Sequence, residues 1–273
     1  MIVTLLQSIL SVISGLLVGF SLGLIGGGGS ILAIPLFIYF VGINEPHKAI
    51  GTTALAVGIN AFINFYQHAK DKNVNFRVGA IFALIGLVGV FIGSEVGLYL
   101  PGKSLLALFA VLMVVIGLYM YVSKCKTLPD QNCKSLKTIK KKKLVLYSSL
   151  VGFASGFFGI GGGFLIVPGI MSSVKIKINQ AIGTSLFVVG TFGIGTAIRY
   201  AFAGDVLPEL SILFIIGGIL GGYFGTRISV KMDKNLLRKI FAAIVIIFGI
   251  YIFLESAIFW YCLVLAKYAI NLT

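Results

Sequence analysis

Two glycine-rich stretches contain the residues of this chain whose types and spacing could do chemistry. They lie in GLIGGGGSILAIPLF, residues 23–37, and in GFFGIGGGFLIVPGI, residues 156–170, and both are otherwise almost wholly apolar. A glycine costs about 1 kcal/mol relative to alanine inside a helix, so consecutive glycines predict a break in each helix. The helix after such a break begins with unpaired backbone N–H groups at the positive end of its dipole, which favours anions. The candidate anion-binding residues are Gly26, Gly27, Gly28, Gly29, Ser30, Gly161, Gly162 and Gly163.

A second set of candidates consists of hydroxyl groups that follow a glycine at the start of a long apolar segment. The motif AIGTT at residues 49–53 recurs as AIGTS at residues 181–185. A hydroxyl in this position either caps a helix or binds an oxyanion. We expect one hydroxyl of each pair to cap a helix and the other to face the anion. The residues are Thr52, Thr53, Thr184 and Ser185.

Three further polar residues lie within apolar segments. Asn60 and Asn64 are four residues apart and therefore share one face of a helix. They either form hydrogen bonds between helices or contact the substrate. Arg199 lies near the end of its segment, where it could attract anions at the outer mouth or reach the lipid headgroups. Glu95 is expected to lie at the membrane interface.

The sequence offers no enzyme chemistry to compete with anion binding. It contains no H-E-x-x-H motif, no cluster of His, Asp and Glu, and no Gly-Lys-Ser/Thr after the glycines. The three cysteines lack the spacing of a zinc site. We therefore expect no enzymatic activity, no cofactor and no metal site. No carboxylate is placed to carry a proton at the middle of the membrane, so in proton-coupled transport the proton would travel on the substrate.

The composition indicates that membrane helices position these residues. Of the 273 residues, 58% are hydrophobic and 11% are charged, and the mean hydropathy is +1.06, which is far outside the range of soluble domains. The formal net charge is +14, and half of it lies in residues 124–143, where eight lysines accompany one acid, Asp130. Lysines clustered beside apolar segments are typical of the positive-inside bias. They predict a cytoplasmic linker and no nucleic-acid partner.

The chain is a duplicated unit. The two glycine stretches are shifted by 133 positions, and the AIGT motifs and four later glycines are shifted by 132. Each copy contains a short hinged pair followed by three apolar segments long enough to span a bilayer. We expect spans at residues 49–69, 77–100, 104–122, 180–203, 208–228 and 236–254, and the short second pieces of the hinged pairs at 30–42 and 163–173.

Three full crossings per copy would place the two copies in opposite orientations. This count agrees with the Lys and Arg distribution, which puts the linker and the loops at 70–77 and 227–239 on the cytoplasmic side. The sequence thus predicts an all-α polytopic membrane protein of two inverted repeats, whose glycine-hinged hairpins meet at the midplane. Whether each hairpin re-enters the membrane or crosses it twice stays open. The predicted parts are a first repeat at 1–123, the linker at 124–143, a second repeat at 144–254 and an apolar extension at 255–273.

The duplicated glycine stretch followed by a proline, together with AIGTT and AIGTS, resembles the TauE/SafE family of sulfite exporters and related permeases, also called the TSUP family. The resemblance runs from about Gly15 to Leu254. It implies a multi-pass protein of the bacterial inner membrane that exports a small sulfur-containing anion, such as sulfite or an organosulfonate, driven by the proton gradient. A permease for another anion, such as a carboxylate, and an anion channel stay open as alternatives, and so does a homodimer.

Overall fold

The computed structural model describes residues 4–70, 73–122, 141–174, 176, 178–229 and 239–255. These residues form helices and no β-strand. Six helices among them are long and apolar enough to cross a bilayer, so the chain is a polytopic all-α membrane protein. Most of the predicted linker, and all but the first residue of the predicted C-terminal extension, lie outside the described residues.

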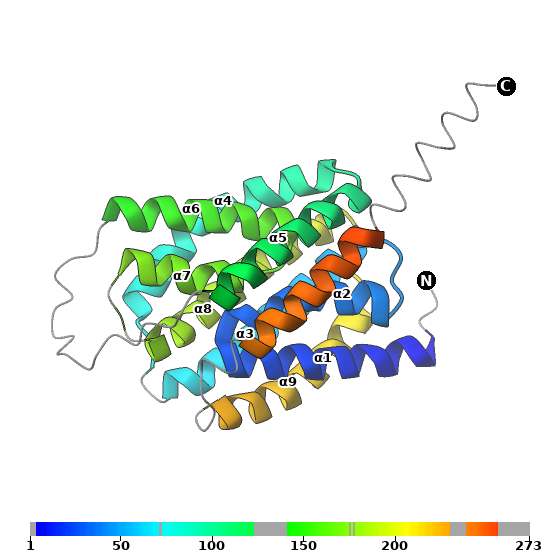
Figure 1. Cartoon of the computed structure of the whole chain (residues 1–273), viewed down its shortest axis with the longest axis horizontal. Helices are drawn as coiled ribbons and strands as arrows, with labels where there is room; N and C mark the ends of the chain where they lie inside the picture. Colours follow the sequence, from blue (N-terminus) through cyan, green and yellow to red (C-terminus); the bar gives the residue numbers. More distant parts are fainter. Residues whose placement is uncertain are drawn as a thin grey trace.

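Figure 1 shows the arrangement of the helices. Each helix predicted as a span has both of its ends within three residues of the expected positions. The first copy contains α1 (Leu5–Ile25), α3 (Pro46–Lys70), α4 (Phe76–Tyr99) and α5 (Gly102–Val122). The second copy contains α6 (Lys141–Phe158), α7 (Gly163–Ser173), α8 (Ile178–Phe202), α9 (Pro208–Ser229) and a helix at 239–255, drawn in orange without a label.

The first glycine hinge is less regular than expected. Helix α1 ends where Gly26 adopts a φ of 76°, a conformation that favours glycine. The sequence predicted one short helix from residue 30. The structure instead has three short helical elements in succession, the first of which begins at Gly26. They are a 3-10 helix, η1 (Gly26–Leu32), a short α2 (Ala33–Pro35) and a π-helical turn, η2 (Leu36–Phe40). Pro35 has no N–H to donate, and in the wider turn after it the amide of Val41 donates to the carbonyl of Leu36.

The second hinge has the bounds expected from the sequence. A turn at residues 159–162 separates α6 from α7, and Gly159, Gly161 and Gly162 in this turn have φ angles of 69°, 64° and 61°. These left-handed conformations reverse the chain within four residues. Helix α7 then begins at Gly163 and ends at Ser173.

Each copy packs its first helix against the fourth helix of the other copy. Helices α1 and α9 run parallel, because Gly15 and Gly19 of α1 meet Phe214 and Gly218 of α9 in the same order. Helices α6 and α4 pair in the same way. Glycines let the backbones approach closely, which is the packing role that small residues commonly have in membranes.

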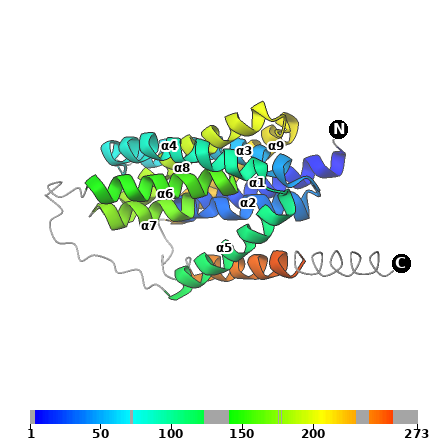
Figure 2. The same cartoon turned by 90° about the horizontal axis from the view of Figure 1, so that it is seen from above.

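Helices α3 and α8, which are counterparts in the duplication, pack against each other and are the most buried of the candidate spans. They run antiparallel: Gly58 meets Gly193 near both midpoints, and Gly51 near the start of α3 meets Asp205 just beyond the end of α8. Helix α5 and the helix at 239–255 are also counterparts. They cross near Gly117 and lie to one side of the other helices in Figure 2.

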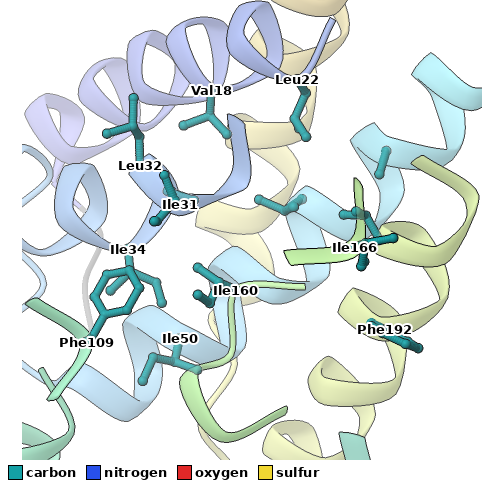
Figure 3. Packing of buried hydrophobic residues seen from close by; sticks show 14 of the residues in the cluster. Val18, Leu22, Ile31, Leu32, Ile34, Ile50, Phe109, Ile160, Ile166 and Phe192 are labelled. Atoms are coloured by element: carbon teal, nitrogen blue, oxygen red, sulfur yellow. The ribbon is translucent and has the colours of Figure 1, made fainter. Parts of the chain in front are cut away.

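Apolar side chains surround the two hinges. Val18 and Leu22 of α1 lie beside Ile31 of η1 in Figure 3, and Ile160 of the second hinge and Ile166 of α7 belong to the same buried cluster. Irregular backbone at membrane depth is tolerated only where protein or water surrounds it rather than lipid. The cluster provides that surrounding for both hinges.

Candidate functional site

The two glycine hinges are in direct backbone contact. A Cβ atom placed on Gly27 would lie 2.6 Å from the Cα atom of Gly163, and one placed on Gly163 would overlap the carbonyl group of Gly27. Real Cβ atoms do not approach other atoms so closely, so each position accepts only glycine. Both residues are buried. We call the region around this contact, residues 26–30 and 159–163, the glycine tips.

The glycine tips lie halfway along a membrane-spanning helix. A Cβ atom on Gly27 would lie 2.8 Å from Cγ2 of Val189, and one on Gly161 would lie 3.2 Å from Cγ1 of the same side chain. Val189 is near the midpoint of α8, which has 25 residues. The two tips therefore share one valine side chain halfway along α8.

The start of α7 leaves backbone donors at this depth. The carbonyl of Gly162 accepts the amides of Leu165 and Ile166 at 2.9 and 3.1 Å. The amides of Gly163 and Phe164 have no intrahelical carbonyl before them, because a helix cannot pair the amides of its first turn. The positive end of the α7 dipole lies at the same place. An anion beside the second tip would meet donors and a positive partial charge without a buried lysine.

Hydrogen bonds in the first tip hold its shape. The amide of Gly26 donates to the carbonyl of Leu22, which ends α1. The Ser30 hydroxyl donates to the carbonyl of Gly27 at 2.9 Å. The hydrogen of Ser30 is therefore used within the turn, and its oxygen retains only the capacity to accept.

Thr52 and Thr184 stabilise the starts of neighbouring helices rather than their own. The Thr52 hydroxyl oxygen accepts the amide of Leu207 at 2.9 Å, just before α9 begins. The Thr184 hydroxyl oxygen accepts the amide of Asn75 at 2.9 Å, just before α4 begins. Leu207 and Asn75 are themselves counterparts, separated by 132 positions. The same hydrogen bond thus links the two copies twice, once in each direction.

The second hydroxyl of each motif donates to its own helix. Thr53 donates to the carbonyl of Ala49 at 2.7 Å, and Ser185 donates to the carbonyl of Ile182 at 2.7 Å. Ser185 also lies next to the first tip, because a Cβ atom on Gly26 would be 3.4 Å from its hydroxyl oxygen. Of the four hydroxyls, that of Ser185 has a direct neighbour in the glycine tips.

The isoleucine of each AIGT motif packs on the opposite hinge, a contact that the sequence reading did not identify. A Cβ atom on Gly26 would lie 2.7 Å from Cγ2 of Ile182, and one on Gly159 would overlap Cγ2 of Ile50. Each isoleucine therefore packs on a glycine of positive φ from the other copy. The recurrence of the AIG triplet was the available signal in the sequence. The triplet alone does not show that its isoleucine packs on the hinge of the other copy.

Asn60 and Asn64 are buried and face α9. Cβ atoms on Gly218 and Gly222 would lie 2.5 Å from Cγ of Asn60 and 2.7 Å from Nδ2 of Asn64. Asn64 donates to the carbonyl of Asn60 in its own helix at 3.0 Å. The amide atoms of Asn60 and the Oδ1 atom of Asn64 have no hydrogen-bond partner within the described part of the chain. The two side chains are thus not joined to α9 by hydrogen bonds.

Arg199 forms an ion pair that the sequence did not predict. Its Nε atom lies 2.5 Å from Oε2 of Glu95 on α4, and both side chains are partly exposed. Arg199 is ten residues beyond Val189, which corresponds to roughly 15 Å along α8, so it lies away from the glycine tips. Predicting this ion pair would require knowing that α4 packs against α8, and neither segment of the sequence shows this alone.

Metal-ligating side chains form no candidate centre in the part of the chain that the structure describes. Among the residues that the structure describes, no group of three or more His, Cys, Asp or Glu could hold a metal ion.

Comparison with known proteins gives a consistent family. Residues 11–252 match the model of the family described as sulfite exporter TauE/SafE. The chain is 45% identical over 257 residues to a "probable membrane transporter protein" of Xylella fastidiosa, covering 93% of this chain and 97% of that protein. A protein of the same description from Methanocaldococcus jannaschii is 30% identical over 90% of this chain and 95% of its own length.

A Bacillus subtilis relative with the same description, YdhB, is 27% identical over 82% of this chain and 91% of its own length. No solved structure matches the chain. The family match covers nearly all of the helices described above, and the relatives are transporters rather than enzymes. The chain is therefore a multi-pass transporter of the cell membrane and belongs to the sulfite exporter TauE/SafE family.

Proposed function

We propose that this transporter exports a small sulfur-containing anion, such as sulfite or an organosulfonate, which binds to backbone amides at the glycine tips. The observation that carries the proposal is the contact of Gly27 with Gly163 at the level of Val189. In this contact the start of α7, whose first amides have no intrahelical acceptor, lies beside the midpoint of α8. The family description, sulfite exporter, supports sulfur oxyanions as the cargo.

We infer that the two copies are inverted repeats. The antiparallel packing of α3 with its counterpart α8 supports opposite orientations. The reciprocal pairing of α1 with α9 and of α6 with α4 supports a two-fold relation between the copies. Such repeats commonly bind substrate where broken helices meet and move against each other in alternating access. Alternating access would then occur around the glycine tips.

The proposed roles divide the candidate residues by position. The glycines of the tips expose amides, and Ser185 lies close enough to contribute a hydroxyl oxygen to the rim of the site. Thr52 and Thr184 position the starts of α9 and α4, and Ser30 holds the turn. Arg199 lies toward the end of α8, where the carboxylate of Glu95 offsets its positive charge. Thr53, Asn60 and Asn64 belong to the central α3 helix.

The proposal is tested by thermal stabilisation of the detergent-purified protein. Sulfite, thiosulfate, sulfate, sulfoacetate, taurine and simple carboxylates are compared at equal ionic strength. A specific ligand at a hundred times its Kd stabilises by about 2.7 kcal/mol. We expect stabilisation by sulfite or a sulfonate. A response confined to carboxylates would establish a different anion, and single-channel currents in place of saturable counterflow in liposomes would establish a channel.

Gly28→Ala provides a matched variant for this binding test. Its φ is not positive, and the added Cβ atom would approach only Ile25, at 3.0 Å from Cγ2. The fold should therefore tolerate the methyl group, which would crowd the first tip. Gly195→Ala is the control, because its Cβ atom would make only ordinary contacts from 3.5 Å outward. We expect ligand stabilisation to fall in Gly28→Ala and to persist in Gly195→Ala.

Proton coupling is tested by flux. Sulfite has a protonation step near neutral pH, so a proton could cross as part of the substrate. Flux driven by a sulfite gradient is measured in liposomes with and without an imposed pH gradient. Flux that is indifferent to the pH gradient would exclude proton symport.

A further inference from the structure

Two stripes of side chains run from the centre of the fold toward opposite surfaces. On α3 the positions four residues apart are Asn60, Asn64 and His68, and on α8 the counterpart positions are Phe192, Thr196 and Tyr200. Asn60 and Phe192 lie close to the crossing of the two helices, where Gly58 meets Gly193. Since α3 and α8 are antiparallel, the stripes diverge from this point. The α3 stripe leads toward the loop before α4, and the α8 stripe leads toward the loop before α9.

The stripes lie at equivalent interfaces, α3 with α9 and α8 with α4, which we call seams. Asn60 packs on Gly218 of α9, and Phe192 packs on Gly86 of α4, the counterpart of Gly218. Further along the second seam, the Tyr200 hydroxyl lies 3.4 Å from the point where a Cβ atom on Gly97 of α4 would sit. The α3 stripe thus faces α9, and the α8 stripe faces α4.

Four of the six stripe residues have buried polar atoms that lack a partner in the described part of the chain. Asn60, Asn64, Thr196 and Tyr200 are all at most 1% exposed. Within the described residues, the side-chain amide of Asn60, the Oδ1 atom of Asn64 and the hydroxyls of Thr196 and Tyr200 have no hydrogen-bond partner. Buried polar groups normally have one, so each exception requires an explanation. Hydrogen bonds between helices do not explain them, because these atoms form none.

The stripes differ at their inner ends. Asn60 gives the α3 stripe a polar group at the level of the glycine tips, whereas Phe192 gives the α8 stripe an aromatic ring there, tilted against Phe82 with 6.4 Å between ring centroids. The polar surface therefore continues to the centre on the α3 side and stops one helical turn short of it on the α8 side.

We propose that the two stripes line the routes by which the anion and its water reach the glycine tips, the α3 stripe from the side of the loop at residues 70–77 and the α8 stripe from the side of the loop at 203–207. The polar atoms would be hydrated when their own seam opens. This inference rests on the proposed transport function, but it concerns the path and not the identity of the anion.

The test is the accessibility of single cysteines to a membrane-impermeant thiol reagent. The three native cysteines, Cys125, Cys133 and Cys262, are replaced by serine. Asn64→Cys and Thr196→Cys report on the two stripes. Ala61→Cys and Ala197→Cys are the matched controls, since both alanines are small, buried and on neighbouring faces of the same helices. Arg77 and Glu45 are exposed, so Arg77→Cys and Glu45→Cys give the labelling rate of a freely accessible cysteine at each surface.

We expect Asn64→Cys to react only from the side on which Arg77→Cys reacts, and Thr196→Cys only from the side on which Glu45→Cys reacts. An open state a few kcal/mol above the closed one is populated at about 0.1 to 10%, so the rates should be lower than those of the exposed cysteines by that factor. The two alanine-site cysteines should stay unlabelled. The proposal would be overturned if Asn64→Cys and Thr196→Cys were labelled no faster than the alanine-site controls. It would also be overturned if both cysteines reacted from the same side of the membrane.

Failure of this proposal is distinguishable from failure of the proposed cargo. Labelling is measured without any anion, so a protein that ignores sulfite would still give the expected pattern if the routes are correct. Conversely, Gly28→Ala should lose ligand stabilisation and keep the labelling pattern. Loss of the pattern with retained sulfite stabilisation would reject the routes alone.

Discussion

Gly27 and Gly163 pack backbone against backbone at the level of Val189, and neither position has room for a Cβ atom. This contact joins the two copies of the duplicated unit at their least regular segments. A membrane helix broken in one place would leave unpaired amides beside apolar side chains. Here the first tip packs on the break before α7, so the first amides of α7 lie in a region that is enclosed by protein.

Gly163→Ala is expected to destabilise the protein, because its methyl group would overlap the carbonyl of Gly27. Overpacking of this kind costs about 1–3 kcal/mol, and here the obstacle is backbone rather than a side chain that can rotate. The measurement is the Tm of the purified protein in detergent. Gly195→Ala, which adds the same methyl group to α8 with ordinary contacts, should leave the Tm near that of the parent. Equal Tm values for the two variants would contradict the close packing of the tips.

Thr52→Val and Thr184→Val are expected to lower the Tm by similar amounts. Each removes the side-chain oxygen that accepts a backbone amide, that of Leu207 or that of Asn75. A buried donor without a partner costs about 1–3 kcal/mol. Serine at either position retains the acceptor and should restore most of the Tm. A change in anion affinity without a change in Tm would instead show that these threonines bind the substrate directly.

Glu95→Gln should free the guanidinium of Arg199 while changing the Tm little. The ion pair is partly exposed, and such pairs contribute little to stability and are weakened by salt. If Arg199 attracts anions to the end of α8, the variant should lower the KM for an anion presented from that side. The effect should shrink as ionic strength rises. An unchanged KM at low salt would limit Arg199 to a structural or interfacial role.

Ile50→Ala and Ile182→Ala are expected to disturb the tips from both sides. Each isoleucine packs on a hinge glycine of the other copy. Ile50 is buried, and removing a buried isoleucine side chain costs about 2–5 kcal/mol, whereas Ile182 is half-buried and should cost less. Both variants should lose Tm and transport in liposomes together. Ile212→Ala, at an exposed position of α9, should change neither. If both variants kept full transport, the isoleucines would not be needed to support the glycine tips.

The sequence predicted the long helices well because their signals are local. Apolar runs of about twenty residues between charged loops gave the spans, and the second hinge was predicted with the bounds that the structure has, residues 163–173. The first hinge was harder. Four glycines carry no Cβ atoms to favour one helical form, so the 3-10 and π-helical turns from Gly26 to Phe40 follow from packing against α1 and from Pro35.

The candidate site was predictable in its glycines and less so in its side chains. The recurrence of AIGTT as AIGTS identified Thr52 and Thr184, but their acceptor role depends on where α9 and α4 begin in space. The partnership of Glu95 with Arg199 depends likewise on the register between α4 and α8. Such registers are set by glycine contacts between helices that are about a hundred residues apart, and a single sequence does not contain them.

The exchange of helices between the two copies also constrains how the protein can be made. Helix α1 has its partner in α9, and α6 has its partner in α4, so neither half of the chain contains the partner of its own first helix. A ribosome that has delivered only the first copy, from α1 to α5, leaves the glycine-lined face of α1 in lipid until α9 emerges. The halves must therefore mature together, and a gene split within the linker should yield a stable protein only when both pieces are synthesised in the same cell.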